Sequence, residues 1–557
     1  MKTTARAGEA ASAWNYADVW ETIAEVRPDE VAQVQGARRS TWADFDRRAD
    51  GVAAALLDAG LGYQAKVAQY LYNCPEYLES IFGAWKAGMV PVNTNYRYGD
   101  DELVYLWDNA DAEAVVFHGT FAERISGLRK RLTAVRSWLW VDDGTDACPS
   151  WATPYGDAVA AATAGQRTVG PWGRGPDDLF LLYTGGTTGM PKGVMWRQDD
   201  LFVVFNRSGR VRYPEDGGLD DVRRQVSALG QSPVKLVPCP PLMHGSGTFT
   251  AFSALSSAGC VVLLEGRSFS ATELLDTIER EQITEIAIVG DAFAKPILRE
   301  LDAAPERWDL SSLWLIVSSG VMWAAETKEG LLRHVPGVLC VDTLGSSESV
   351  GMASSQSSRK GTVGTAGFRL SPDARVLDDD GRDVVPGSGD RGLVALRGRM
   401  SLGYYKDPDK TDRTFMVIDG ERWSIPGDYA SVDADGTVKL LGRGSVCINT
   451  GGEKVFPEEV EEVLKLHPSV ADAVVVGLPD ERFGEAVIAV VEPVASGETL
   501  DDAARAAIVA HVKERLAHYK APRQLVTVTT IGRAASGKVD YRRLRADAAA
   551  QLGITLA

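Results

Sequence analysis

The segment that most constrains the fold runs from Leu181 to Trp196 and reads LLYTGGTTGMPKGVMW. The apolar run from Leu179 to Tyr183 predicts a short buried strand. A loop rich in glycine and threonine follows it. Glycines let a backbone approach an anion and present its N–H groups, while hydroxyls and a lysine add donors and charge. The segment therefore predicts a polyphosphate site at a strand end, formed by Thr184, Gly185, Gly186, Thr187, Thr188 and Lys192.

This loop differs from a Walker loop, in which serine or threonine follows the lysine. Lys192 lies instead between Pro191 and Gly193. An ordinary strand-to-helix turn is the simpler alternative, but such a turn rarely combines this many threonines and glycines with a lysine. We therefore expect a phosphate-binding loop of another kind.

The composition is that of an ordinary globular protein, with 45% hydrophobic and 24% charged residues among 557. Such a length favours at least two domains. The 59 basic and 76 acidic residues give a net charge of −17, which argues against a nonspecific binder of nucleic acid or anionic membranes. No apolar run is long enough for a signal peptide or a membrane span, and the six scattered cysteines contain no C-x-x-C. We expect a cytoplasmic protein with reduced thiols and no zinc site.

Helix-like and strand-like patterns alternate through the first three quarters of the chain. Thr41 and Asp44 form a capping-box-like start of a helical pattern that Gly60 ends. The alternation predicts an α/β fold of layered helices and parallel strands, in which ligands bind at strand ends. Two Gly- and Ser-rich segments, 318–320 and 345–347, follow such strands. The strand-like runs are 67–71, 114–117, 261–264, 286–289 and 313–317.

The pattern changes near Gly442 to Ser445. The change predicts a large N-terminal domain at 1–443 and a small α+β domain at 444–557. The small unit shows an acidic helix at 457–466, strand-like runs at 473–476 and 486–491, and an amphipathic helix carrying Ile508, Val512 and Leu516.

Three motifs, YTGGTTG-PKG, GSSE at 345–348 and GRGSVCINTGGEKVFPEEVEE at 442–462, resemble the adenylate-forming (ANL) superfamily over nearly the full length. The residues of these motifs resemble in particular those of actinobacterial acyl-CoA synthetases of fatty-acid and sterol-side-chain catabolism. The resemblance implies a two-step reaction. A carboxylic acid first attacks the α-phosphate of ATP bound with Mg²⁺, giving an acyl-adenylate and pyrophosphate. The thiol of coenzyme A then displaces AMP, so the protein supplies positioning and charge.

The resemblance also implies roles around ATP. Glu348 matches the glutamate that holds Mg²⁺, and Thr184 could add a hydroxyl ligand to the metal. Leu344 occupies the place of the aromatic residue that usually stacks on the purine. The adenine and ATP contacts implied are Ser319, Gly320, Asp342, Thr343, Leu344 and Ser347.

Further implied residues lie toward the C-terminus. Asp428 matches the aspartate that accepts hydrogen bonds from both ribose hydroxyls, and Arg443 matches the arginine beside it. Lys538 matches the catalytic lysine, which the mobile C-terminal domain brings to the α-phosphate. Ser445 lies at the hinge between the domains. The candidates for contact with coenzyme A or phosphate are Gly451, Gly452 and Lys454.

His244 lies in a glycine-rich loop after two prolines, and the resemblance implies that it forms a catalytic wall of the acyl pocket. A structural histidine bonded to a backbone carbonyl is the alternative. Small neighbours predict a pocket wide enough for a bulky acyl group. The pocket residues expected are His244, Gly245, Gly290 and Asp291.

Three functions stay open at this point. The favoured one is an ATP-dependent acyl-CoA synthetase for a hydrophobic fatty acid or a bulky, sterol-type acid. The second is a stand-alone adenylating enzyme that loads a carrier protein. The third, a nucleotide-binding regulator without catalysis, is disfavoured because Glu348, Asp428 and Lys538 are all present. The acid itself and the oligomeric state are left open, although homodimers are common in such families.

Overall fold

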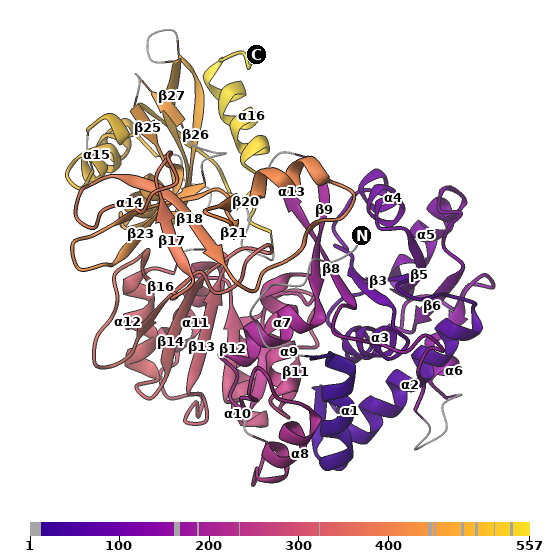
Figure 1. Ribbon diagram of the computed structural model, residues 1–557. Helices are drawn as coiled ribbons and strands as arrows, with labels where there is room; N and C mark the ends of the chain where they lie inside the picture. Colours follow the sequence, from indigo (N-terminus) through magenta and orange to yellow (C-terminus); the bar gives the residue numbers. More distant parts are fainter. Residues whose placement is uncertain are drawn as a thin grey trace.

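The computed structural model describes residues 13–160, 167–186, 189–232, 234–321, 323–443, 448–450, 453–480, 484–495, 500–516, 518–534 and 539–556. Helices cover and separate three sheets in this part of the chain (Figure 1). The helices are α1 (Tyr16–Val26), α2 (Trp42–Asp58), α3 (Pro75–Lys86), α4 (Asp100–Asn109), α5 (Ala122–Leu128), α6 (Tyr155–Ala160), α7 (Gln198–Asn206), α8 (Leu219–Ser227), α9 (Gly245–Ser256), α10 (Ala271–Glu281), α11 (Asp291–Ala303), α12 (Ala325–His334), α13 (Pro408–Thr414), α14 (Pro457–Lys465), α15 (Asp502–Lys513) and α16 (Tyr541–Leu552).

An eight-stranded sheet in the order β19-β9-β8-β4-β3-β5-β6-β7 forms the first layer. The strands from β8 to β7 in this order run parallel, while β9 returns antiparallel to β8. The short strand β19 comes from much later in the sequence and pairs with β9. The strands are β3 (Lys66–Tyr70), β4 (Val90–Asn93), β5 (Ala112–His118), β6 (Ser137–Val141), β7 (Thr153–Pro154), β8 (Leu179–Gly186), β9 (Gly189–Arg197) and β19 (Gly403–Tyr404).

The second sheet has fifteen strands, and its strand pairing changes from mostly parallel to antiparallel half-way. Strands β1, β11, β10, β12, β13 and β14 are parallel, as the sequence predicted. They are β1 (Val31–Gln35), β10 (Lys235–Pro238), β11 (Cys260–Leu263), β12 (Glu285–Ile288), β13 (Leu315–Ser319) and β14 (Leu339–Leu344). The edge strand β2 (Arg38–Thr41) is antiparallel to β1.

Beyond β14 the expected alternation of strands and helices was wrong, because residues 353–443 form mostly antiparallel strands. In β15, buried and exposed residues alternate, as they do in a sheet with one wet face. Such strands need only short connections. They are β15 (Ala353–Ser357), β16 (Gly367–Leu370), β17 (Ala374–Leu377), β18 (Arg391–Arg397), β20 (Phe415–Ile418), β21 (Glu421–Ser424), β22 (Asp428–Val432) and β23 (Val438–Arg443).

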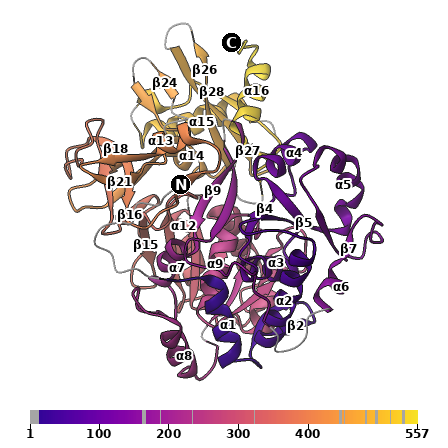
Figure 2. The same ribbon diagram turned by 45° about the vertical axis from the view of Figure 1, so that its right-hand side comes forward.

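The largest hydrophobic core lies between the two sheets. It joins side chains from α1, α2, α3 and α9 to the inner faces of both sheets. Figure 2 shows these helices side by side in the lower part of the molecule. Trp20 packs against Trp85 and Phe252, with ring centroids 5.5 and 5.7 Å away. Burial of such aromatic side chains contributes strongly to stability.

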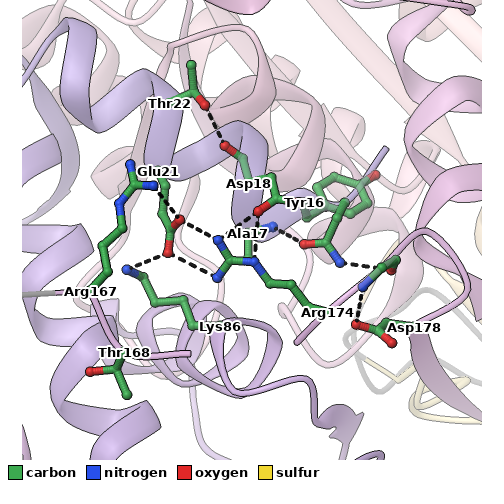
Figure 3. A network of polar contacts seen from close by, with 12 residues as sticks. Tyr16, Ala17, Asp18, Glu21, Thr22, Lys86, Arg167, Thr168, Arg174 and Asp178 are labelled. Carbon is green, nitrogen blue, oxygen red and sulfur yellow. Dashed lines mark hydrogen bonds and ion pairs between the residues drawn. The ribbon is translucent and has the colours of Figure 1, made fainter. Parts of the chain in front are cut away.

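A polar network fastens the first three helices to one another, and Figure 3 shows the part of it around Glu21, Lys86 and Arg174. The Lys86 ammonium on α3 lies 2.9 Å from Glu21, 2.7 Å from Asp46 and 2.8 Å from Asp50. Arg174 also bonds Glu21, which is 1% exposed. A buried cation surrounded by carboxylates is satisfied within the protein, so this network has a structural role. The predicted capping box at Thr41 is confirmed at the start of α2.

A separate five-stranded sheet follows, in the order β25-β24-β27-β26 with β28 beside β27. One face packs on α14 and α15, and the other packs on α16. The predicted acidic helix and both strands are confirmed, and Ile508 and Val512 are buried as expected, while Leu516 lies beyond the end of α15. The strands are β24 (Ile448–Thr450), β25 (Glu453–Val455), β26 (Val470–Asp480), β27 (Gly484–Pro493) and β28 (Gln524–Thr527).

None of the helices in the described ranges is both long and apolar enough to cross a bilayer. The cysteines described as free thiols are Cys74, Cys148, Cys239, Cys260 and Cys340.

Candidate active site

The predicted phosphate segment is a β-hairpin. Thr184 in β8 lies opposite Lys192 in β9, and Gly186 lies opposite Gly189. The expectation of a loop from Thr184 onward was therefore wrong in extent, because the strand continues through Gly185 and Gly186. Thr187 and Thr188 lie outside the described residues. Directly opposed residues share a face of a sheet, so the Thr184 hydroxyl and the Lys192 ammonium leave the hairpin on the same side.

Asn93 at the end of β4 anchors this hairpin. Its side-chain amide donates to the carbonyl oxygens of Tyr183 at 2.8 Å and Met243 at 2.6 Å. Asn93 is buried and joins the hairpin to the loop that carries His244. The sequence analysis missed Asn93. A polar residue directly after the apolar strand Val90–Val92 was the available signal.

The His244 loop is held by close backbone packing. His244 is half-buried, precedes α9, and its N–H donates to the Pro241 carbonyl at 3.0 Å. A Cβ at Gly247 would lie 2.6 Å from that same carbonyl oxygen, and one at Gly245 would lie 3.2 Å from Leu182. Close packing thus explains why both positions are glycine. Their small size alone does not indicate a wide acyl pocket.

The carboxyl ends of β12, β13 and β14 lie together, because these strands are parallel neighbours. Ser319 is the register partner of Thr343, whose hydroxyl donates to the Ser318 carbonyl at 3.0 Å. The Gly290 N–H donates to the Ser318 hydroxyl at 3.0 Å. Gly320 has φ +89°, a conformation that favours glycine. These bonds fix the rim on which the predicted adenine contacts lie.

Two predicted aspartates at this rim have protein partners. Asp342 lies 3.5 Å from Lys328 of α12, and both side chains are buried. Burial raises the pKa of Asp342 to about 6, although Lys328 opposes this shift. Asp291 accepts the Ala324 N–H at 3.2 Å, and burial raises the pKa of its carboxyl. The sequence analysis missed Lys328, because a lysine in a helical pattern gives no sign of being buried.

Glu348 is fixed beside β9. It is 8% exposed, and the Tyr404 hydroxyl donates to its Oε1 at 2.6 Å. The adjacent Ser347 carbonyl accepts the Trp196 indole N–H at 2.8 Å. Leu344 is also nearly buried and packs in the hydrophobic cluster of the antiparallel strands. Tyr404 was not predicted, since nothing near it in the sequence marks a partner for Glu348.

These surroundings fit a magnesium ion held mainly by substrate. No group of three or more metal-binding side chains was found among the described residues. Mg²⁺ commonly takes one or two protein carboxylates and fills its other positions with phosphate oxygens and water. A carboxylate has more acceptor positions than the one that Tyr404 uses. Glu348 therefore suits such an ion next to the hairpin.

Lys192 and Glu348 are brought together by the segment after β18. The Lys192 ammonium lies 3.4 Å from the carboxylate of Asp407, three residues beyond Tyr404. Strand β19 pairs with β9, so one segment contacts both the hairpin lysine and the candidate metal ligand.

The candidate ribose residues also meet. Asp428 opens β22 and is the register partner of Arg443 at the end of β23. Asp428 is 8% exposed. Lys454 lies in β25 opposite Asn449. The predicted catalytic, hinge and coenzyme A residues Lys538, Ser445, Gly451 and Gly452 lie outside the described residues.

Comparison with known proteins decides the family. The model of the AMP-binding enzyme matches residues 20–405, and that of the AMP-binding enzyme C-terminal domain matches 459–538. The chain belongs to the AMP-binding enzyme family. The identification as a member of the adenylate-forming superfamily, and as an enzyme, is therefore confirmed.

Several relatives match end to end. The medium/long-chain-fatty-acid–CoA/3-oxocholest-4-en-26-oate–CoA ligase of Mycolicibacterium smegmatis is 40% identical over 95% of this chain and 96% of its own. The 3-oxocholest-4-en-26-oate–CoA ligase of Rhodococcus rhodochrous is 38% identical over 95% of each. The resemblance to actinobacterial acyl-CoA ligases is thereby confirmed.

Solved structures confirm the fold class. The anthranilate CoA ligase AuaEII in complex with anthranoyl-AMP superposes with a TM-score of 0.82 at 24% identity, covering 99% of this chain and all of that one. ATP-bound MatB from Rhodopseudomonas palustris gives 0.76 at 25% identity, covering 95% and 98%.

Proposed function

We propose that this protein is an AMP-forming acyl-CoA ligase that uses ATP with Mg²⁺ to activate a hydrophobic carboxylic acid and transfers the acyl group to coenzyme A. The observation that carries the proposal is the convergence of Lys192 and Glu348 on one segment, with Asp407 and Tyr404 as their partners. A cation and a carboxylate that contact the same segment suit a phosphate and its metal ion, which supports the proposal. The CoA ligases that match end to end support the same reaction.

The acid that we propose is a medium- or long-chain fatty acid or a sterol-side-chain acid. The names of the relatives from Mycolicibacterium and Rhodococcus support this class. The acid would lie near His244, Gly245, Gly290 and Asp291, beside the starts of α9 and α11. Close packing explains the two glycines of the His244 loop. Our proposal of a wide pocket is therefore supported by the relatives and not by the small size of these residues.

The roles that we propose for the nucleotide residues are those that the family resemblance implies, and their charge and position support them. The hairpin from Thr184 to Lys192 would hold the β- and γ-phosphates, where hydroxyl and ammonium donors share one face. Bound Mg²⁺ would supply charge neutralisation at the phosphates, with Glu348 as its protein ligand and Thr184 as a further candidate. Asp428 and Arg443, opposed on neighbouring strands, would hold the ribose. The adenine would contact Ser319, Gly320, Asp342, Thr343 and Leu344, with Ser347 nearby.

We further propose two domains, at 1–443 and 444–557. The change of sheet between β23 and β24 supports a boundary at this point. The smaller domain would turn at Ser445 and bring Lys538 to the α-phosphate for adenylation. A different face, with Gly451, Gly452 and Lys454, would serve thioester formation. A cytoplasmic location fits the free thiols and the supply of ATP and coenzyme A.

A pyrophosphate-release screen over fatty, aryl and steroid acids tests the proposal, followed by thioester detection with coenzyme A. We expect release with hydrophobic aliphatic or steroid acids and a thioester product. Accumulation of acyl-adenylate that acylates a carrier protein but never coenzyme A would instead favour the carrier-loading alternative.

A further inference from the structure

Lys410 lies beside the phosphate hairpin although it is far from it in the sequence. Helix α13 begins a few residues after β19, which pairs with β9. The Tyr405 N–H donates to the Gly193 carbonyl at 2.8 Å, next to Lys192. Figure 1 shows α13 next to the end of β9. The first turn of α13 is therefore fixed against the strand that carries Lys192.

One carboxylate organises both lysines. Asp407 caps α13, because its Oδ1 accepts the Lys410 backbone N–H at 3.0 Å. Its Oδ2 lies 3.4 Å from the Lys192 ammonium. Asp407 thus holds the backbone of one lysine and the charge of the other.

The Lys410 ammonium lies over the ring of Tyr404, the residue that bonds Glu348. It lies 4.9 Å from the ring centre. The pKa of Lys410 is lowered, first because the side chain is partly buried and then because the Lys192 ammonium is close. Glu348 and Asp407 oppose this shift. Lys410 thus lies near Glu348 and Asp407, and it shares Asp407 with Lys192.

Like charges held close together repel, and lysine side chains are flexible enough to separate. A polyanion between them removes the repulsion and gains from both charges. The phosphates expected at the hairpin are such a polyanion. Glu348 is the expected ligand of Mg²⁺, so with the metal bound Asp407 is left to balance both ammonium groups.

We propose that Lys410 is a second phosphate-binding lysine, which with Lys192 grips the β- and γ-phosphates of ATP and then the departing pyrophosphate. Asp407 holds Lys192 in place until the nucleotide binds. This inference rests on the proposed function, since it concerns the same ATP site. It adds a ligand from α13 that the hairpin motif does not contain.

Isothermal titration calorimetry of the full-length protein with Mg-ATP, Mg-pyrophosphate and AMP tests the proposal without any acid. We expect Lys410→Met to weaken ATP and pyrophosphate binding about tenfold. The affinity for AMP should stay within twofold of wild type, because AMP lacks the phosphates that Lys410 would contact. Lys410→Arg keeps the charge and should stay within threefold for all ligands. Lys406→Met is the matched control, because Lys406 pairs with Asp111 at the surface 2.7 Å away.

Unchanged ATP and pyrophosphate affinities in Lys410→Met would overturn the proposal. An equal loss of affinity for AMP in this variant would also overturn it, since that indicates general damage to the site. A wild-type protein that binds ATP but releases no pyrophosphate with any acid would count against the proposed function and not against Lys410. The two proposals can therefore fail separately.

Discussion

Two clusters of lysine and carboxylate show how the same residue types serve stability in one region and ligand binding in another. Lys86 is fully buried and meets three carboxylates at 2.7–2.9 Å. Lys192 is 35% exposed, meets Asp407 at 3.4 Å and has Lys410 close by. Around Lys86 the charge is satisfied within the protein, whereas Lys192 and Lys410 share Asp407 and would need a bound anion once Glu348 holds the metal ion. Changes to the first cluster should cost stability, and changes to the second should cost substrate binding.

The largest effect is expected at the buried cluster. Lys86→Met should lower the free energy of unfolding by about 3–5 kcal/mol, because it leaves carboxylates buried without their cation. Urea unfolding followed by circular dichroism measures this. Lys439→Met is the control, since Lys439 is 57% exposed and its pair with Asp433 should contribute at most about 1 kcal/mol. Equal losses in both variants would show that the buried cluster has no special structural role.

Lys538→Ala should lower the rate of adenylation by about 10²–10³, the usual cost of losing a charge contact in the transition state. The unfolding midpoint should not change. Pyrophosphate release gives the rate, and thioester formation from supplied acyl-adenylate should be affected less. If adenylation continues near the wild-type rate, another residue carries the catalytic charge.

Asp46→Asn should show that ionisation of Asp46, one carboxyl of the Lys86 cluster, lowers the free energy of unfolding near neutral pH. Burial raises the pKa of Asp46 to about 6, so the native state binds this proton more tightly than the unfolded state. The contribution of Asp46 to stability therefore falls as pH rises from about 4 to about 6, and the variant lacks this fall. The free energy of unfolding of the variant minus that of the wild type should therefore be about 1–3 kcal/mol more favourable to the variant at pH 7.5 than at pH 4.5. Urea unfolding at both pH values tests this, and a constant difference would contradict it.

The smallest effect is expected from Tyr404→Phe, which removes the hydroxyl that orients Glu348. Loss of one hydrogen bond to a charged group should raise the Mg²⁺ concentration for half-maximal activity about tenfold. Titration with Mn²⁺ in the presence of ATP, followed by electron paramagnetic resonance, should show the same loss of affinity. Tyr405→Phe is the control, because its hydroxyl bonds Asp111 at the surface. A larger loss in the control would exclude a positioning role for Tyr404.

The parallel half of the fold was predictable because its signals are local. Apolar runs such as 67–71 and 286–289 differ from β3 and β12 by a single residue at each end, and the Thr41 capping box starts α2 as expected. The antiparallel strands from β15 to β23 were missed. Their half-exposed pattern is weak in the sequence, and their pairing depends on distant partners.

Within the candidate site, motif residues could be named but their partners could not. The sequence indicated Lys192 by the chemistry of its loop and Glu348 by resemblance, and both contact the segment that carries Tyr404 and Asp407. Asn93, Lys328 and Tyr404 were missed, because an asparagine, a lysine or a tyrosine takes such a role only when another segment is placed against it.

The sequence by itself determined the family, the glycine- and hydroxyl-rich composition for which we predict phosphate binding at 184–192, and the kinds of side chain available for a metal and a nucleotide. Local patterns carry this information because glycine, hydroxyl and charge have fixed chemistry wherever they lie. The tertiary structure decided that this segment is a hairpin, that β19 pairs with it, and that Lys410 and Lys192 share Asp407. Such contacts arise from the packing of distant strands, and no local pattern specifies which charges that packing brings together.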